Sequence, residues 1–239
     1  MRQTDVDVIL PCFNPPLGWV QSLLDNMKAL VALHPDLSLG CIVVNDGSTR
    51  GIDKYDIDLL NKQFPSCKIY SYTENKGKGY AVRYGIEQSR APYLIYTDID
   101  FPFELSSMQD MLHLLLSGAD IVVGHRQKSY ENQLHTFRRI LSSGSHFFNK
   151  VFLNLPYIDT QGGLKCFNAQ GKEYMLKTKI NRYLFDTEFL LMATQSGKLN
   201  IKEMPIEANP NIHFRQMGIN TLRKEIFGMI RLVLIKFFG

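Results

Sequence analysis

Two aspartates two residues apart, Asp98 and Asp100, are the residues of this chain best suited to chemistry. They follow an apolar run, residues 91–97, that predicts a short buried strand. Because burying an unpaired carboxylate is costly, we expect both side chains at an exposed strand end. At the carboxyl edge of a parallel sheet, such a pair can hold Mg²⁺ or Mn²⁺ carrying a diphosphate. A solvated acidic pair at a strand end explains the same spacing, so both interpretations stay open on this pair alone.

Polar loops end four of the expected strands, at residues 11–16, 45–49, 74–79 and 97–100. In a parallel sheet these ends lie along one edge, so the loops should converge on one crevice. In the third loop, Gly77 and Gly79 allow a ligand to approach the backbone, and Lys78 adds positive charge. The helix that follows would point its N-terminus at an anion. Each loop also has a structural explanation, since Asn-Asp-Gly-Ser is typical of turns and helix caps.

The elements that must position these loops alternate along the first half of the chain. We expect strands at residues 6–10, 39–44, 68–72, 93–97 and 120–124, separated by helices at 17–33, 52–64, 77–89 and 105–117. This alternation predicts a mostly parallel sheet with right-handed crossovers. The second half is less regular, with helices expected at 134–153, 186–196 and 219–238 and strands at 164–168 and 200–207, the last interrupted by Pro205.

Length and composition predict one large α/β domain. The chain has 239 residues, 45% hydrophobic and 21% charged, and its net charge of +4 favours anionic partners. The four cysteines are widely spread without a CxxC spacing, so we expect small apolar core residues in a reducing compartment (Cys12, Cys41, Cys67 and Cys166). We expect neither a leader segment nor a membrane-spanning stretch.

Six motifs occur in order, at residues 8–14, 45–49, 75–85, 124–126, 159–167 and 185–188. They include Asn-Lys-Gly-Lys-Gly-Tyr-Ala-Val-Arg-Tyr-Gly and Asp-Thr-Gln-Gly-Gly-Leu-Lys-Cys-Phe. Together they resemble the family 2 glycosyltransferases with the GT-A fold, and within that family the polyprenyl-phosphate (dolichyl-phosphate) glucosyl- and mannosyltransferases. The resemblance implies a single Rossmann-like domain, residues 1–215, with a mostly parallel mixed sheet flanked by helices. A basic amphipathic helix, residues 216–239, would follow it.

The resemblance also implies the reaction, an inverting and metal-dependent transfer of a hexose from UDP-glucose or GDP-mannose to a polyprenyl phosphate. Asp98 and Asp100 would hold Mg²⁺ or Mn²⁺ and, with Arg126, would be catalytic. The acceptor phosphate would lie at Arg126, Arg139 and Ser143. The positions implied for the nucleotide sugar are Pro11, Phe13, Asn14, Asp46, Asn75, Lys78, Arg83, Asp98 and Ile99, with Phe13 stacking on the base and Asp46 accepting from it.

Two other functions stay open. A hydroxyl acceptor on a cell-surface glycan would need a carboxylate base, for which Asp186 and Glu188 are candidates, although they could equally be supporting or helix-capping residues. The second alternative is a non-catalytic module that binds a nucleotide sugar. It is suggested by Pro102, which stands where close relatives often have a glutamine near the metal. His125 could touch the acceptor or be structural.

The end of the chain raises the question of a membrane. Residues 226–238 are apolar but interrupted by Arg231 and Lys236, which predicts an interfacial helix or one packed on the domain's own core. With a lipid acceptor, we expect a cytoplasmic protein, peripheral at the cytoplasmic face of a membrane. We expect no nucleic-acid partner, and the sequence defines no oligomeric state.

Overall fold

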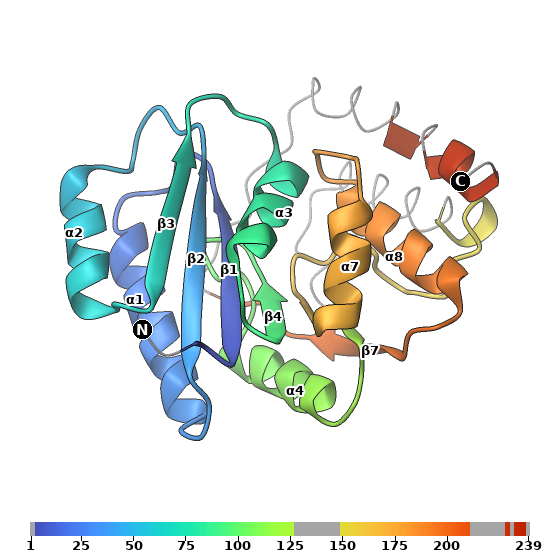
Figure 1. Ribbon diagram of the computed structural model, residues 1–239, viewed down its shortest axis with the longest axis horizontal. Coiled ribbons are helices and arrows are strands. Elements are labelled where there is room, and N and C mark those ends of the chain that lie inside the picture. The colour runs from blue at the N-terminus through green and yellow to red at the C-terminus, as the bar shows by residue number, and fades with distance from the viewer. Residues whose placement is uncertain (1–2, 127–148, 211–227, 230–231, 238–239) are drawn as a thin grey trace.

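The computed structural model describes residues 3–126, 149–210, 228–229 and 232–237. Its centre is a seven-stranded sheet in the order β3-β2-β1-β4-β6-β5-β7 (Figure 1). The strands are β1 (Val6–Cys12), β2 (Leu39–Asp46), β3 (Cys67–Tyr72), β4 (Tyr93–Tyr96), β5 (Ile121–Arg126), β6 (Lys165–Phe167) and β7 (Ile201–Ile206). The helices are α1 (Trp19–Leu33), α2 (Lys54–Gln63), α3 (Lys78–Gln88), α4 (Leu105–Leu116), α7 (Ala169–Lys177) and α8 (Phe185–Ser196).

The sheet is mixed and mostly parallel, as the sequence predicts. Strands β1 to β4 pair in parallel, as do β5 and β7, whereas β6 runs antiparallel to both β4 and β5. From β1 the chain adds β2 and β3 on one side and β4 on the other, so the strand order reverses between β1 and β4. A reversal of this kind opens a crevice at the carboxyl ends of the strands, where α/β proteins bind ligands.

Two apolar cores cover the two faces of the sheet. One core joins the sheet to α1, α2 and α4, and the other joins it to α3, α7 and α8. Within β1, Val8 and Leu10 face the first core and Ile9 faces the second, so the strand is buried on both sides. Central parallel strands need such continuous apolar runs, and this is why the first-half strands stand out in the sequence.

The second half contains the differences from the predicted elements. Helix α7 was not predicted; the residue before it, Asn168, caps the helix, and its side chain accepts hydrogen bonds from the backbone N–H groups of Gln170 and Gly171. The prediction that Pro205 interrupts its strand was wrong. Strand β7 is continuous and Pro205 pairs with His125, because β7 lies at the edge of the sheet and needs no ladder N–H on its outer side.

All four cysteines are buried, which confirms their predicted place in the core. Burial, with a smaller contribution from Asp56, raises the pKa of the Cys12 thiol to about 12. A thiol in this state is a small apolar side chain, not a nucleophile.

The two long helices expected in the second half fall largely outside the described residues. Residues 149–151 are helical and belong to the predicted helix at 134–153, and residues 232–237 are helical at the chain's end. Leu232 is fully buried in the core beside α8. The predicted domain boundary at residues 215 and 216 lies outside the described residues and stays a prediction. Among the helices that the structure describes, none has the length and apolar character needed to cross a membrane.

Candidate active site

The acidic pair lies at the expected edge of the sheet, directly after β4. Asp98 is partly exposed and Asp100 is exposed, whereas the Ile99 side chain between them belongs to the core. Phe101 follows with a left-handed φ of 46° and donates its N–H to the Asp98 carbonyl at 3.0 Å. A non-glycine residue in this conformation is strained. The tight turn leaves both carboxylates accessible at the strand end, Asp98 in part and Asp100 more fully, while the Ile99 side chain stays in the core.

Lys78, the first residue of α3, lies against the acidic pair. Its Nζ is 2.6 Å from Asp98 Oδ1, and its side chain is largely buried. Burial alone would lower the pKa of Lys78, but the carboxylates of Asp98 and Asp186 outweigh it and raise the pKa above its usual value. The backbone of Gly163 closes the other side, because a Cβ on Gly163 would lie 2.9 Å from Asp98 Oδ2.

The acidic pair has the chemistry of a divalent-metal site completed by a substrate. In the described part of the chain no cluster of three or more His, Cys, Asp and Glu side chains could hold a metal ion. Mg²⁺ and similar ions are commonly held by one or two carboxylates together with substrate phosphates. Asp98 and Asp100 supply those two carboxylates with hard oxygen ligands, so the residues present fit such an ion.

Asp46 holds the third loop in place. Its carboxylate accepts hydrogen bonds from Asn75 Nδ2 at 2.9 Å, from the Lys76 N–H at 2.7 Å and from the Gly77 N–H at 2.9 Å. The Asp46 carbonyl accepts from Asn75 as well, at 3.1 Å. The side chain is buried, so its oxygens stabilise the loop that leads into α3. This arrangement gives no support to the expected contact between Asp46 and a base.

Asn14 links the first two loops in a similar way. Its side-chain oxygen accepts from the backbone N–H groups of Thr49, at 2.9 Å, and Arg50, at 3.3 Å. Its own N–H donates to Ser48 Oγ at 2.9 Å. Phe13, the preceding residue, remains 46% exposed beside this linked pair of loops. Of the two neighbours, Phe13 is thus the one placed to meet a ligand with its side chain.

The segment at residues 178–181 occupies the N-terminus of α3. The Asn181 carbonyl accepts from the N–H groups of Gly79, at 2.8 Å, and Tyr80, at 3.4 Å. A Cβ on Gly77 would collide with the same carbonyl, and one on Gly79 would lie 2.6 Å from the Ile180 carbonyl. The expectation that these glycines admit a ligand and that the helix N-terminus faces an anion is therefore corrected. The Ile180 and Asn181 carbonyls fill the space beside the two glycines, and the Asn181 carbonyl accepts the N–H groups at the helix N-terminus.

Arg83 fastens that segment from the side. Its guanidinium is buried and donates to Thr178 Oγ1 at 3.1 Å, to the Ile180 carbonyl at 2.9 Å and to the Asn181 side chain. The expected donor contact of Arg83 gains no support from this geometry. Glu188 secures the segment too, since its carboxylate accepts from the N–H groups of Lys179 and Ile180 at 2.9 and 2.7 Å.

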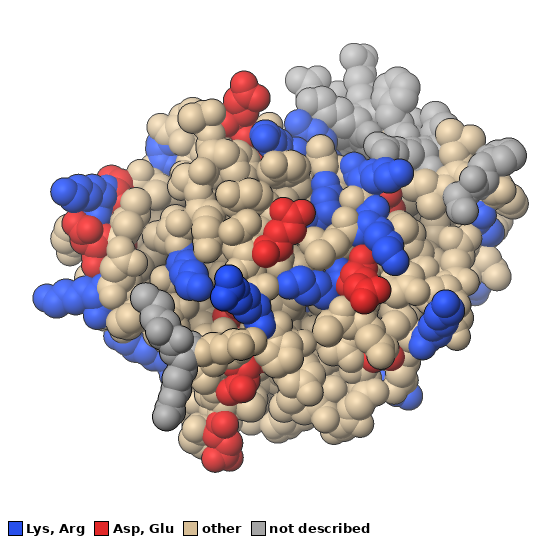
Figure 2. All heavy atoms as spheres, viewed as in Figure 1, with Lys and Arg blue, Asp and Glu red and all other residues tan. Residues whose placement is uncertain are grey.

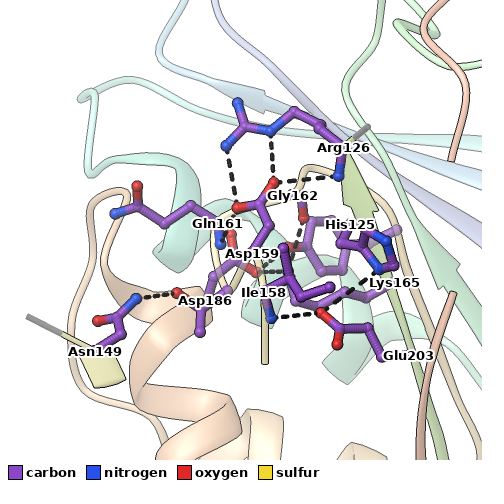
Figure 3. Close-up of polar contacts among 12 residues, drawn as sticks. His125, Arg126, Asn149, Ile158, Asp159, Gln161, Gly162, Lys165, Asp186 and Glu203 are labelled. Carbon is purple, nitrogen blue, oxygen red and sulfur yellow. Dashed lines mark hydrogen bonds and ion pairs between the residues drawn. The ribbon is translucent and has the colours of Figure 1, made fainter. Parts of the chain in front are cut away.

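Arg126, at the end of β5, forms a two-pronged ion pair with Asp159 (Figure 3). Its Nε is 2.6 Å from Oδ2 and its Nη2 is 3.1 Å from Oδ1. Figure 3 also shows His125 of β5 beside Glu203 of β7, with Nδ1 3.6 Å from Oε1, a distance too long for a hydrogen bond. The other two acceptor residues predicted from the sequence, Arg139 and Ser143, lie outside the described residues.

Lys165 is a charged residue of the site that the sequence alone did not single out. It is fully buried on β6, with its Nζ 3.0 Å from Asp186 Oδ1 and 2.7 Å from the Gly162 carbonyl. Burial lowers the pKa of Lys165 and raises that of Asp186, and the attraction between the two charges opposes both shifts. Lys165 and Asp159 both lie in the motif at residues 159–167. That motif could have identified them, since charged residues beside an apolar strand need partners.

The fold and the site together define a glycosyltransferase of the GT-A type. The chain belongs to Glycosyl transferase family 2, whose sequence profile matches residues 7–178. It is 30% identical over 217 residues to a dolichyl-phosphate beta-glucosyltransferase of Dictyostelium discoideum, an alignment covering 85% of this chain and 65% of that protein. It is 26% identical over 221 residues to the protein of the same name from Saccharomyces cerevisiae, covering 84% of this chain and 66% of that protein. The chain thus spans just under two thirds of the length of these curated relatives.

Solved structures agree on the fold. Glucosyl-3-phosphoglycerate synthase from Mycobacterium tuberculosis, in complex with phosphoglyceric acid, superposes with a TM-score of 0.64 at 16% identity, covering 98% of this chain and 80% of that one. The mannosyltransferase PcManGT from Pyrobaculum calidifontis, in complex with GDP-Man and Mn²⁺, gives a TM-score of 0.61 at 16% identity, covering 98% and 64%. At this identity the likeness concerns architecture alone.

Proposed function

We propose that this protein transfers a hexose from a nucleotide sugar, UDP-glucose or GDP-mannose, to a polyprenyl phosphate, with inversion and with a divalent metal ion. The observation that carries the proposal is the Asp98 carboxylate, partly exposed at the point where the strand order reverses and paired with Lys78 at 2.6 Å. The relatives named dolichyl-phosphate beta-glucosyltransferase support the polyprenyl-phosphate acceptor and favour UDP-glucose as the donor.

In this proposal the donor lies over the carboxyl ends of β1 and β4. Asp98 and Asp100 would hold Mg²⁺ or Mn²⁺, which when bound would neutralise the charge of the leaving nucleoside diphosphate. Lys78 adds a positive charge at the same place. The exposed ring of Phe13 is available to stack on the base, with Pro11 beside it in β1. We assign Asn14, Asp46, Asn75 and Arg83 to holding the loops that surround the donor.

The acceptor phosphate would approach Arg126. A phosphate oxygen is a nucleophile at neutral pH, so no general base is needed. A hydroxyl acceptor would require one, and the two candidates are occupied, because Asp186 pairs with Lys165 and Glu188 accepts from two backbone N–H groups. The burial of both carboxylates thus favours the lipid phosphate over the hydroxyl.

A membrane surface would supply such an acceptor. Four exposed apolar side chains, which we call the apolar patch, come from two described segments, residues 149–152 and residues 232–237 near the chain's end (Val151, Phe152, Leu234 and Phe237). The segments touch, because Lys236 Nζ donates to the Phe152 carbonyl at 2.7 Å. Figure 2 shows Lys and Arg side chains over the face that carries α3 and α7, with fewer acidic ones among them. These features support a protein peripheral at a membrane surface, and the cytoplasmic face is our proposal.

The test is a transfer assay. The protein is incubated with polyprenyl phosphate, Mn²⁺ and radiolabelled UDP-glucose or GDP-mannose, and the organic phase is counted. We expect labelled glycolipid from one donor, and none from the Asp98→Asn variant or in the presence of EDTA. Transfer to a soluble sugar with the lipid inert would contradict the acceptor. Donor binding without transfer, unchanged by Asp98→Ala, would contradict an enzymatic role and favour a binding module.

A further inference from the structure

A buried lysine lies directly behind the acidic pair. Strand β6 places Lys165 opposite Tyr96 in the antiparallel ladder with β4, two residues before Asp98. Lys165 is fully buried, which is rare for a lysine unless its charge is matched. Figure 3 shows its side chain running beneath the loop at residues 159–163.

The Lys165 ammonium has three partners, enough for its three N–H donors. They are Asp186 Oδ1 at 3.0 Å, the Tyr96 hydroxyl at 3.3 Å and the Gly162 carbonyl at 2.7 Å. The Tyr96 hydroxyl donates in turn to Asp186. The group formed by Lys165, Asp186 and Tyr96, which we call the buried triad, therefore joins β4, β6, α8 and the loop before β6.

Through Gly162, the buried triad reaches the acidic pair. A Cβ on Gly162 would collide with the Gly124 carbonyl, so the loop is pressed against the end of β5. The next residue, Gly163, approaches Asp98 so closely that a Cβ there would lie 2.9 Å from Oδ2 and 3.5 Å from Lys78 Nζ. The position of this loop therefore limits the orientations open to the Asp98 carboxylate.

The charges extend the same connection. In the order Asp98, Lys78, Asp186 and Lys165 the charges alternate in sign, because Lys78 is attracted by both Asp98 and Asp186 and Asp186 pairs with Lys165. A buried ion pair adds little net stability, because the loss of hydration offsets the attraction. Stability alone therefore does not explain the buried triad, whereas a role in positioning Asp98 does.

We propose that Lys165, Asp186 and Tyr96 are positioning residues that hold Gly162 and Gly163 against Asp98 and so set its carboxylate for the divalent ion and the donor diphosphate. The inference rests on the proposed function, since it assumes a metal ion at Asp98 and Asp100. The buried triad touches neither ion nor donor and acts through the loop.

The experiment measures the affinity for Mn²⁺ in the presence of UDP, by electron paramagnetic resonance of the free ion. The main variant is the double substitution Lys165→Met with Asp186→Asn, which leaves no unpaired charge. A second variant, Tyr96→Phe, removes one hydroxyl and keeps the ion pair. The control is Lys172→Met, which removes a hydrogen bond of 2.8 Å to the Ser89 carbonyl at the other end of α3. Each variant is measured well below its own melting temperature.

We expect the double variant to bind Mn²⁺ about tenfold more weakly, as for other residues that orient metal ligands. Tyr96→Phe should weaken binding about threefold, as for the loss of one hydrogen bond. Lys172→Met should bind like the wild type even if it melts earlier. Wild-type affinity in a folded double variant, or in Tyr96→Phe should the double variant not fold, would overturn the inference. If Asp98→Asn binds Mn²⁺ as the wild type does, the proposed metal site itself fails.

Discussion

The polar side chains of the loops divide into those that hold the loops and those that face the crevice. Asp46 and Asn14 accept backbone N–H groups of neighbouring loops, and Arg83 donates to the segment at residues 178–181. Asp98 and Phe13 keep part of their side chains exposed. A motif contains both kinds of residue, so residue type alone does not separate a ligand contact from a loop contact.

Gly163 tests the crowding around Asp98. In Gly163→Ala the added methyl group would meet Asp98 Oδ2, the end of a side chain that can rotate away. We expect a change in unfolding free energy below about 1 kcal/mol, but a fall of about tenfold in kcat/KM for sugar transfer, because the displaced carboxylate no longer meets the metal.

The matched control is Gly171→Ala, whose methyl group would lie 2.6 Å from Phe167 Cβ and 2.9 Å from the Asp120 carbonyl. It should destabilise the fold by about 1–3 kcal/mol through overpacking and leave kcat/KM unchanged. Urea unfolding and the transfer assay measure the two effects. Equal kcat/KM in Gly163→Ala and wild type would contradict the role of this contact.

Phe13 tests base stacking. The ring is 46% exposed, so Phe13→Ala should hardly change stability. If the ring stacks on the base, donor KM should rise about tenfold, as for other aromatic–base contacts. Tyr55→Ala, which removes an exposed ring on α2, is the control. A donor KM that stays at the wild-type value in Phe13→Ala would place the base elsewhere.

At the scale of elements, the α3 N-terminus and the segment at residues 178–181 form one unit. The Asn181 carbonyl caps the helix, Arg83 binds the segment from within α3, and Glu188 at the start of α8 binds its N–H groups. Residues about 100 positions apart thereby position Lys78, the residue next to Asp98.

Arg83→Met separates this structural role from the donor contact expected from the sequence. The variant leaves the Ile180 carbonyl and the Asn181 side chain without their buried, charged donor. We expect a loss of about 3 kcal/mol in unfolding free energy by urea titration, with donor KM changed less than kcat. The exposed Arg90→Met is the control. A stable Arg83→Met protein with a large rise in donor KM would restore the direct contact.

The predictability of the elements follows from their burial. Strands β1 to β5 were located from the sequence within two residues at each end, because continuous apolar runs fill both cores. The insertion of the three-residue β6 between β4 and β5 depends on long-range pairing that no local pattern encodes.

For the site, Asp98 and Asp100 could be found from their place after a strand. The pairing of Lys165 with Asp186, and of Arg126 with Asp159, joins motifs that only the folded chain brings together.

At the scale of the whole molecule, the two halves of the chain meet at the carboxyl edge of the sheet. The part before β5 brings Phe13, the acidic pair and Tyr96 of the buried triad, and the part from β5 onward, here called the second half, brings Arg126, Asp159, Lys165 and Asp186. The apolar patch lies on the second half as well, on the right of Figure 1, while α2 lies at the far left. In the proposed reaction, the half that supplies Arg126 is thus also the one that would meet the lipid.

The apolar patch leads to a prediction about vesicle binding. With a net charge of +4 and exposed Phe152 and Phe237 beside Lys236, the protein should cosediment with vesicles containing anionic lipid, and less so at high salt. Replacing both phenylalanines by serine should weaken binding by about tenfold or more, because each ring would bury apolar area in the lipid interface. Tyr55→Ser removes the exposed ring of α2, on the opposite side of the molecule, and should bind like the wild type. Equal loss of binding in both variants would point to nonspecific attraction. If the wild-type protein does not bind vesicles, membrane association is removed from the proposed function. The transfer reaction would then still be judged by its own assay.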